Sequence, residues 1–202
     1  MDSEKYISHS VVSLISAKGG VGTSTLTKEL AIAFSKGLSV CLVDMALSCP
    51  DQDALFRIIP TKTLEDLFKD KESNLQPLSW RDLEPGLTLV PDRNIHLLSS
   101  KQVKRDYPLT LNQIDRLVSS LKTQFDLVLL DTDTASVDAA AKLVELSDLT
   151  LLITDDTENS IKNNQRFRRL LTQKQISYDH VQLVVNKIME KQIYDEKNGL
   201  SY

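Results

Sequence analysis

A glycine-rich stretch near the start of the chain, residues 16–25 (Ser-Ala-Lys-Gly-Gly-Val-Gly-Thr-Ser-Thr), has the composition of a phosphate-binding loop. Its three glycines allow the backbone to curl with its N–H groups turned inward, toward an anion. The apolar run 11–15 before it predicts a buried strand, and the apolar spacing over 26–34 predicts a helix after it. A strand, a glycine-rich turn and a helix N-terminus together make a site for phosphate groups.

The loop departs from the usual pattern at both ends. That pattern begins with glycine and ends with lysine followed by serine or threonine. Here Ala17 stands in the first place and Thr23-Ser24 in the last two. The loop therefore keeps the glycines that shape it but has no positive charge where a lysine normally reaches the phosphates.

Three other polar residues each follow an apolar, strand-like run: Asp44, Asp131 and Asn186. The carboxyl ends of parallel strands share one edge of a sheet, which is where α/β proteins bind ligands. We therefore expect these strand ends to lie at the edge that carries the phosphate loop. Asn186, taken alone, fits the cap of a strand end equally well.

The elements that position these residues alternate along the chain. Alternating strands and helices imply βαβ units, so we expect an α/β fold, with a mostly parallel central sheet flanked by helices. Residues 92–110 indicate a surface loop, with or without a short helix. The expected strands are 11–15, 38–43, 86–90, 125–130, 149–153 and 181–185, and the expected helices are 26–34, a short one near 54–56, 63–68, 111–121, 137–146 and 159–171.

The whole chain suits one domain, residues 1–202, with flexible ends at 1–10 and 190–202. The net charge of −4 gives no bulk electrostatic reason for nucleic-acid binding. Two cysteines and the lack of a signal peptide predict a reducing, cytoplasmic setting. No apolar run approaches the roughly 18 residues of a membrane span.

The run Lys18-Gly19-Gly20-Val21-Gly22 resembles the loop of the MinD/ParA family of P-loop ATPases, which carries an extra lysine before the glycine pair. Asp44, Asp131 and Asn186 match the family's other marks in order, over residues 10–187. The resemblance implies a P-loop NTPase-type three-layer sandwich, and it implies ATP or ADP with Mg²⁺ as ligands. By resemblance, the phosphates are wrapped by the N–H groups of Gly19, Gly20, Val21, Gly22, Thr23, Ser24 and Thr25.

The resemblance also implies individual roles. Ser24 matches the hydroxyl that ligates Mg²⁺, and Asp131 holds the magnesium shell through water. Asp44 matches a catalytic acid, and Asn186 matches the amide that reads the adenine edge. Lys18 matches the lysine that reaches the partner's nucleotide across a homodimer, which makes it the second catalytic candidate; its alternative is a solvated loop lysine.

Two departures from the family bear on turnover. Thr23 replaces the phosphate-binding lysine, and Ala46 stands where an acidic residue helps to orient the attacking water. Phosphoryl transfer depends on such charge stabilisation and water placement. The sequence therefore predicts a nucleotide-gated dimerising switch with weak or absent hydrolysis. The alternatives are an active partition or positioning ATPase and a nucleotide-free scaffold.

The loop looks most like the CpaE/TadZ branch, whose members position pilus and secretion machinery. This resemblance implies recruitment to the cell pole or membrane periphery and a protein partner that the sequence does not identify. Asp133 either faces the metal or caps the helix that starts near Ser136. The basic helix 159–174 suits a solvated face better than non-specific DNA contact.

Overall fold

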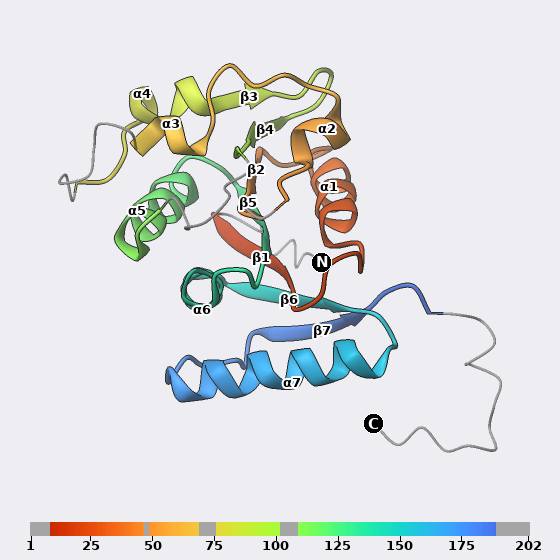
Figure 1. The fold of residues 1–202 in the computed structure, drawn as a ribbon. Coiled ribbons are helices and arrows are strands. Elements are labelled where there is room, and N and C mark those ends of the chain that lie inside the picture. Colours follow the sequence, from red (N-terminus) through yellow and green to blue (C-terminus); the bar gives the residue numbers. More distant parts are fainter. Residues whose placement is uncertain (1–8, 47–48, 69–75, 102–108, 189–202) are drawn as a thin grey trace, which may run out of the picture.

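A seven-stranded sheet forms the middle layer of the protein, in the order β3-β4-β2-β5-β1-β6-β7 (Figure 1). The computed structural model describes residues 9–46, 49–68, 76–101 and 109–188. The described strands are β1 (Ser10–Ser16), β2 (Val40–Asp44), β3 (Leu87–Leu89), β4 (Ile95–Leu98), β5 (Leu127–Asp133), β6 (Leu149–Thr154) and β7 (Val181–Val185).

All neighbouring strands in this sheet run parallel except β3, which pairs antiparallel with β4 at one edge. The register between β2 and β5 places Asp44 directly opposite Asp131. Strand β1 lies between β5 and β6, and its carboxyl end leads into the phosphate loop. The predicted strand ends therefore meet at one edge of the sheet.

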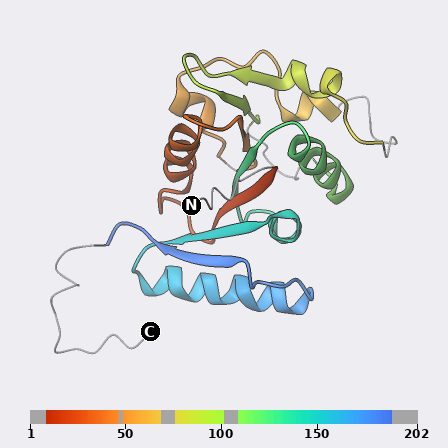
Figure 2. The same cartoon turned by 180° about the vertical axis from the view of Figure 1, so that it is seen from behind.

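Helices cover both faces of the sheet, which completes the three-layer sandwich (Figures 1 and 2). One face carries α1 and α2, and the other carries α3, α5, α6 and α7, as the core clusters show. The described helices are α1 (Thr23–Phe34), α2 (Gln52–Phe56), α3 (Leu64–Phe68), α4 (Trp80–Leu83), a 3₁₀ turn (Glu84–Gly86), α5 (Leu111–Lys122), α6 (Val137–Leu146) and α7 (Glu158–Gln173).

Alternation along β1 explains the two-sided core. Val11 packs in the cluster with α5 and α6, whereas Leu14 packs in the cluster with α1. Strands β2 and β5 do the same, because side chains alternate between the faces and both faces are covered by helices. These continuous apolar strands hold the polar strand ends at a fixed edge.

The six predicted strands are present, but the expectation of a loop over 92–110 is wrong in part. Residues Ile95–Leu98 form β4, which pairs in parallel with β2. The strand is only four residues long, follows a turn directly and contains His96, so its apolar pattern is too short to read. The predicted strand 86–90 is the antiparallel edge strand β3.

The predicted flexible ends fall almost entirely outside the described residues, although Ser10 already belongs to β1. None of the helices in the described part of the chain is long and apolar enough to span a bilayer.

Candidate functional site

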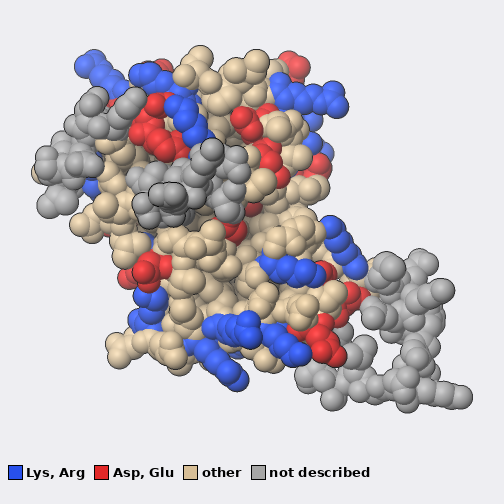
Figure 3. Space-filling view, in the orientation of Figure 1, with Lys and Arg blue, Asp and Glu red and all other residues tan. Residues whose placement is uncertain are grey.

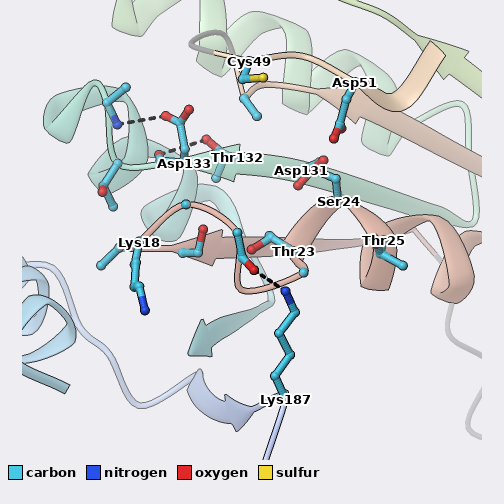
Figure 4. Close-up of a pocket in the computed structure, with 18 residues that line it drawn as sticks. Lys18, Thr23, Ser24, Thr25, Cys49, Asp51, Asp131, Thr132, Asp133 and Lys187 are labelled. Carbon is cyan, nitrogen blue, oxygen red and sulfur yellow. Dashed lines mark hydrogen bonds between the residues drawn. The ribbon is translucent and has the colours of Figure 1, made fainter. Parts of the chain in front are cut away.

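A cavity of about 540 Å³ opens at the carboxyl edge of the sheet, directly over the phosphate loop (Figure 4). It is lined by residues 16–20 and 22–25, by the segment 131–135 that ends β5, and by residues of the loop after β2. Of the predicted nucleotide-binding residues, Val21 and Asn186 lie outside this lining, and Val21 is buried in the core. The structure thus brings the predicted loop and one predicted carboxylate, Asp131, to the same cavity.

The N-terminus of α1 lies at this cavity, with Thr23, Ser24 and Thr25 in the lining. Its N-cap, Gly22, has no side chain to accept a hydrogen bond, and the first turn contains no acidic residue. Helices α5, α6 and α7 differ, since their N-caps Thr110, Ser136 and Thr157 each accept a backbone N–H. The donors that start α1 therefore remain available to an anion.

Asn186 and Lys187, at the end of β7, brace the phosphate loop from outside. The amide nitrogen of Asn186 donates to the carbonyl of Val21 at 2.8 Å, and the Lys187 ammonium donates to the carbonyl of Gly20. A Cβ at Gly22, whose φ is +96°, would lie 2.7 Å from Nδ2 of Asn186. Asn186 was expected to read adenine; in this structure its amide holds the loop, so the adenine role stays a prediction.

Ser24 and Asp131 lie together at the cavity floor, as the resemblance implied for a magnesium site (Figure 4). The Ser24 hydroxyl is close enough to Asp131 to lower the pKa of that carboxyl, and the Thr27 hydroxyl lies 3.4 Å from Oδ1 of Asp131. No cluster of three or more His, Cys, Asp or Glu side chains poised for a metal occurs in the described residues. Mg²⁺ commonly takes one or two protein ligands and completes its shell with phosphates and water, so Ser24 and Asp131 are the residues that would hold it here.

Burial dominates the electrostatics of the two strand-end acids. It raises the pKa of Asp131 to about 6, although hydrogen bonds from Gln52 and Ser24 oppose the shift. Burial, followed by repulsion from Asp131, raises the pKa of Asp44 well above its usual value. A cation between Ser24 and Asp131 would relieve this cost, since opposite charge favours the ionised form.

Asp44 is 1% exposed and does not line the cavity. Its Oδ2 accepts the backbone N–H groups of Asp51 and Gln52, both at 3.0 Å. Its Oδ1 lies 3.3 Å from the backbone nitrogen of Ala46. In this structure Asp44 therefore organises the loop after β2, and its catalytic role stays a prediction.

Lys18 also lines the cavity, but its ammonium group already has a partner. It donates to Oδ2 of Asp155 at 2.6 Å and to the Thr157 hydroxyl at 3.2 Å. The Lys18 side chain is 35% exposed. A solvated loop lysine was the alternative interpretation, and this ion pair shows that the side chain has a defined partner within its own subunit.

Asp133 supports the turn before α6. Its Oδ1 accepts the backbone N–H of Ala135 at 2.8 Å, while Ser136 accepts that of Ala139 and caps the helix. Asp133 therefore does not cap α6 itself, and although it lines the cavity, its role toward a metal stays a prediction.

The predicted basic helix corresponds to α7, where Lys and Arg side chains gather at the surface (Figure 3). Several of them already have partners in the same chain. Lys162 pairs with Glu158 at 3.3 Å, and the Arg168 guanidinium lies 4.9 Å from the centre of the Tyr178 ring. This supports the interpretation of a solvated helix face.

Sequence reasoning missed Gln52 and Asp155. Asp155 follows β6 immediately, so the strand-end signal that found Asp44 and Asp131 could have found it. No comparable signal marks Gln52, because its position depends on how the loop after β2 folds back under Asp44.

A family model described as cellulose biosynthesis protein BcsQ matches residues 9–191. A putative septum site-determining protein MinD of Emiliania huxleyi is 26% identical over 191 residues, covering 92% of this chain and 66% of the relative. The MinD of Thermotoga maritima is 24% identical over 182 residues, covering 88% and 64%.

Among solved structures, a ParA family ATPase from Chlorobium tepidum superposes with a TM-score of 0.76 at 18% identity. The alignment covers 93% of this chain and 78% of that one, which supports the same fold. The chain spans slightly less than two thirds of the length of the two MinD relatives.

Proposed function

From the membership of this chain in the BcsQ family, within the wider MinD/ParA group of P-loop ATPases, we propose its function. The protein is an ATP- and Mg²⁺-dependent dimerising switch. The observation that carries the proposal is the cavity over the phosphate loop, where α1 presents N–H groups that no side chain caps. Such a site prefers an anion with several acceptor oxygens, as the phosphates of a nucleotide have.

Magnesium prefers oxygen ligands, and the Ser24 hydroxyl and the Asp131 carboxylate lie beside the N–H groups that start α1. Ser24 would ligate the ion directly, and Asp131 would hold its shell through water. The bound ion would supply positive charge against the phosphate oxygens. The chain's own contribution is to fix the Ser24 hydroxyl against the Asp131 carboxylate in a buried setting.

Slow or absent hydrolysis is part of the proposal. Thr23 lies in the cavity lining, and because its side chain is neutral, this position supplies no charge to a phosphate. Its buried hydroxyl has no hydrogen-bond partner among the described residues. Ala46 also lines the cavity and offers no acid to orient water. Because the site lacks both groups that would favour the transition state, we expect it to bind better than it turns over.

Dimerisation would use Lys18. In one subunit the lysine is held by Asp155 at the edge of the cavity. A nucleotide bound between two subunits would offer Lys18 a more highly charged partner than Asp155. Dimerisation with ATP would therefore replace the Lys18–Asp155 ion pair by one between Lys18 and the nucleotide phosphates. The switch would then present a new joint surface to its protein partner.

We propose a cellular process on the basis of the family description. Its name points to cellulose biosynthesis, so we place the switch beside a polysaccharide-producing machine, which it would recruit or position from the cytoplasm at the membrane periphery or cell pole. The resemblance of the loop to CpaE/TadZ proteins is the argument for pilus or secretion machinery instead. Non-specific DNA contact is not favoured, because charges on α7 are partly paired.

Calorimetric titration with ATP and Mg²⁺, combined with a phosphate-release assay, tests the proposal. We expect binding by the wild type, weaker binding by Ser24→Ala in the presence of Mg²⁺, and release of phosphate far slower than by ordinary ATPases. No binding would favour the nucleotide-free scaffold. Fast release that Asp44→Ala abolishes would favour an active partition or positioning ATPase.

A further inference from the structure

Gln52 joins three separate parts of the nucleotide site, although it lies in none of the predicted motifs. It is the first residue of α2 and is completely buried. Its Nε2 donates to Oδ2 of Asp131 at 2.7 Å and to the backbone carbonyl of Ser24 at 2.9 Å. Its backbone N–H donates to Oδ2 of Asp44 at 3.0 Å.

The chemistry of these neighbours fixes the orientation of the Gln52 amide. A carboxylate and a carbonyl are both acceptors, so only the NH₂ end of the amide can face them. The opposite orientation would place Oε1 against two oxygen atoms. Both N–H groups of the amide are therefore used to hold Asp131 against the turn of α1 that contains Ser24.

A buried amide costs free energy unless its polar atoms find partners. The two N–H groups of Gln52 do, but its Oε1 has none among the described residues. An apolar side chain of similar volume would avoid that cost. The buried amide of Gln52 thus costs stability and orients the Asp131 carboxylate, which indicates a functional role for that orientation.

We propose that Gln52 is a positioning residue for the divalent cation that accompanies the nucleotide. It turns the Asp131 carboxylate so that Oδ2 is occupied by the amide while Oδ1, with its long contact to Thr27, remains for the hydrated cation. Its backbone N–H also donates to Asp44, so the first residue of α2 contacts both strand-end acids. The inference rests on the proposed nucleotide function, because phosphates must complete the shell.

Partners that orient a metal-binding carboxylate typically contribute 10–100-fold to metal affinity. Gln52→Leu keeps the volume and removes both N–H donors. We expect it to raise the Mg²⁺ concentration for half-maximal nucleotide binding by about 10–100-fold. Nucleotide binding in EDTA should stay as in the wild type, because Gln52 contacts the carbonyl of Ser24 and not the N–H groups of the loop that face the phosphates.

The experiment is a titration of the full chain with a fluorescent ATP analogue at a series of Mg²⁺ concentrations, with melting temperatures as a check of folding. Gln113→Ala is the matched control, since Gln113 is also buried but belongs to the N-terminal cap of α5. Gln52→Asn, whose amide is one methylene shorter, carries the same test if the leucine variant does not fold.

A shift in Mg²⁺ requirement for the Gln52 variants alone supports the proposal. If the wild type binds nucleotide with Mg²⁺ and Gln52→Leu needs the same Mg²⁺ concentration, the positioning role is overturned and the proposed function stands. An equal loss of binding in EDTA also overturns it, because the residue then supports the loop in general. A wild type that binds no nucleotide removes both proposals.

Discussion

The ammonium group of Lys18 lies 2.6 Å from Oδ2 of Asp155, so the extra lysine of the phosphate loop is held within its own subunit. Asp155 also accepts hydrogen bonds from the hydroxyls of Thr157 and Ser160. The hydrogen bond from Lys18 has the largest effect on Asp155, followed by those from the two hydroxyls, and together they hold the pKa of Asp155 well below its usual range. The carboxylate therefore stays charged at neutral pH and competes with any nucleotide for the lysine.

Asp155→Asn should ease dimerisation. The variant removes the charge that holds Lys18, so we expect ATP-dependent dimers at a several-fold lower protein concentration, measured by sedimentation. Asp138→Asn is the control, because it breaks the 2.6 Å ion pair with Lys174 elsewhere on the surface. Equal dimerisation of all three proteins would mean that the Lys18–Asp155 pair does not restrain the switch.

Gly22→Ala should damage the loop. Its positive φ disfavours a side chain, and a Cβ would meet the Asn186 amide at 2.7 Å. We expect a loss of about 1–3 kcal/mol in the free energy of unfolding, together with weaker nucleotide binding. Gly19→Ala is the control for stability, since nothing lies within 4 Å of its added Cβ. Urea unfolding distinguishes them, and equal losses would contradict the bracing role of Asn186.

Thr23→Lys should strengthen ATP binding. The new ammonium group would stand where P-loop ATPases normally carry lysine, and a charge-assisted hydrogen bond contributes roughly 1.5–3 kcal/mol, or about tenfold and more in affinity. Gly37→Lys adds the same charge beyond the far end of α1 and should leave affinity unchanged. Calorimetry measures both. Unchanged binding by Thr23→Lys would place the phosphates elsewhere.

His96 should make stability depend on pH. The residue packs against Trp80 and Phe125, its Nδ1 has no partner among the described residues, and burial lowers its pKa. The unfolded chain then takes up the proton first, so this contribution to stability is present above about pH 6.5 and decreases as the pH falls toward the folded-state pKa.

Urea unfolding of wild type and His96→Phe at pH 7.5 and 5.5 measures this contribution. The wild type should lose more stability on acidification than the variant, whereas His180→Gln should behave like the wild type. The same loss in all three proteins would show that other groups cause the pH dependence.

The phosphate loop and the strand-end acids Asp44 and Asp131 could be predicted from the sequence. Each follows a long apolar run, and the change from apolar to polar residues marks the end of the strand. Strand β4 could not, since four residues do not establish a period. Gln52 could not either, because its contacts with Asp131 and Ser24 arise from the folding of a loop. Asp155 could have been predicted as a strand-end acid, because it directly follows β6. Its ion pair with Lys18 could not, because that contact depends on the fold.

Sedimentation velocity with ATP and Mg²⁺ tests the central claim most directly. We predict that the wild type and Lys36→Ala, a variant of an exposed lysine, become dimers with ATP and stay monomers with ADP, while Lys18→Ala stays monomeric with both. A wild type whose sedimentation is the same with ATP, with ADP and without nucleotide would contradict the switch.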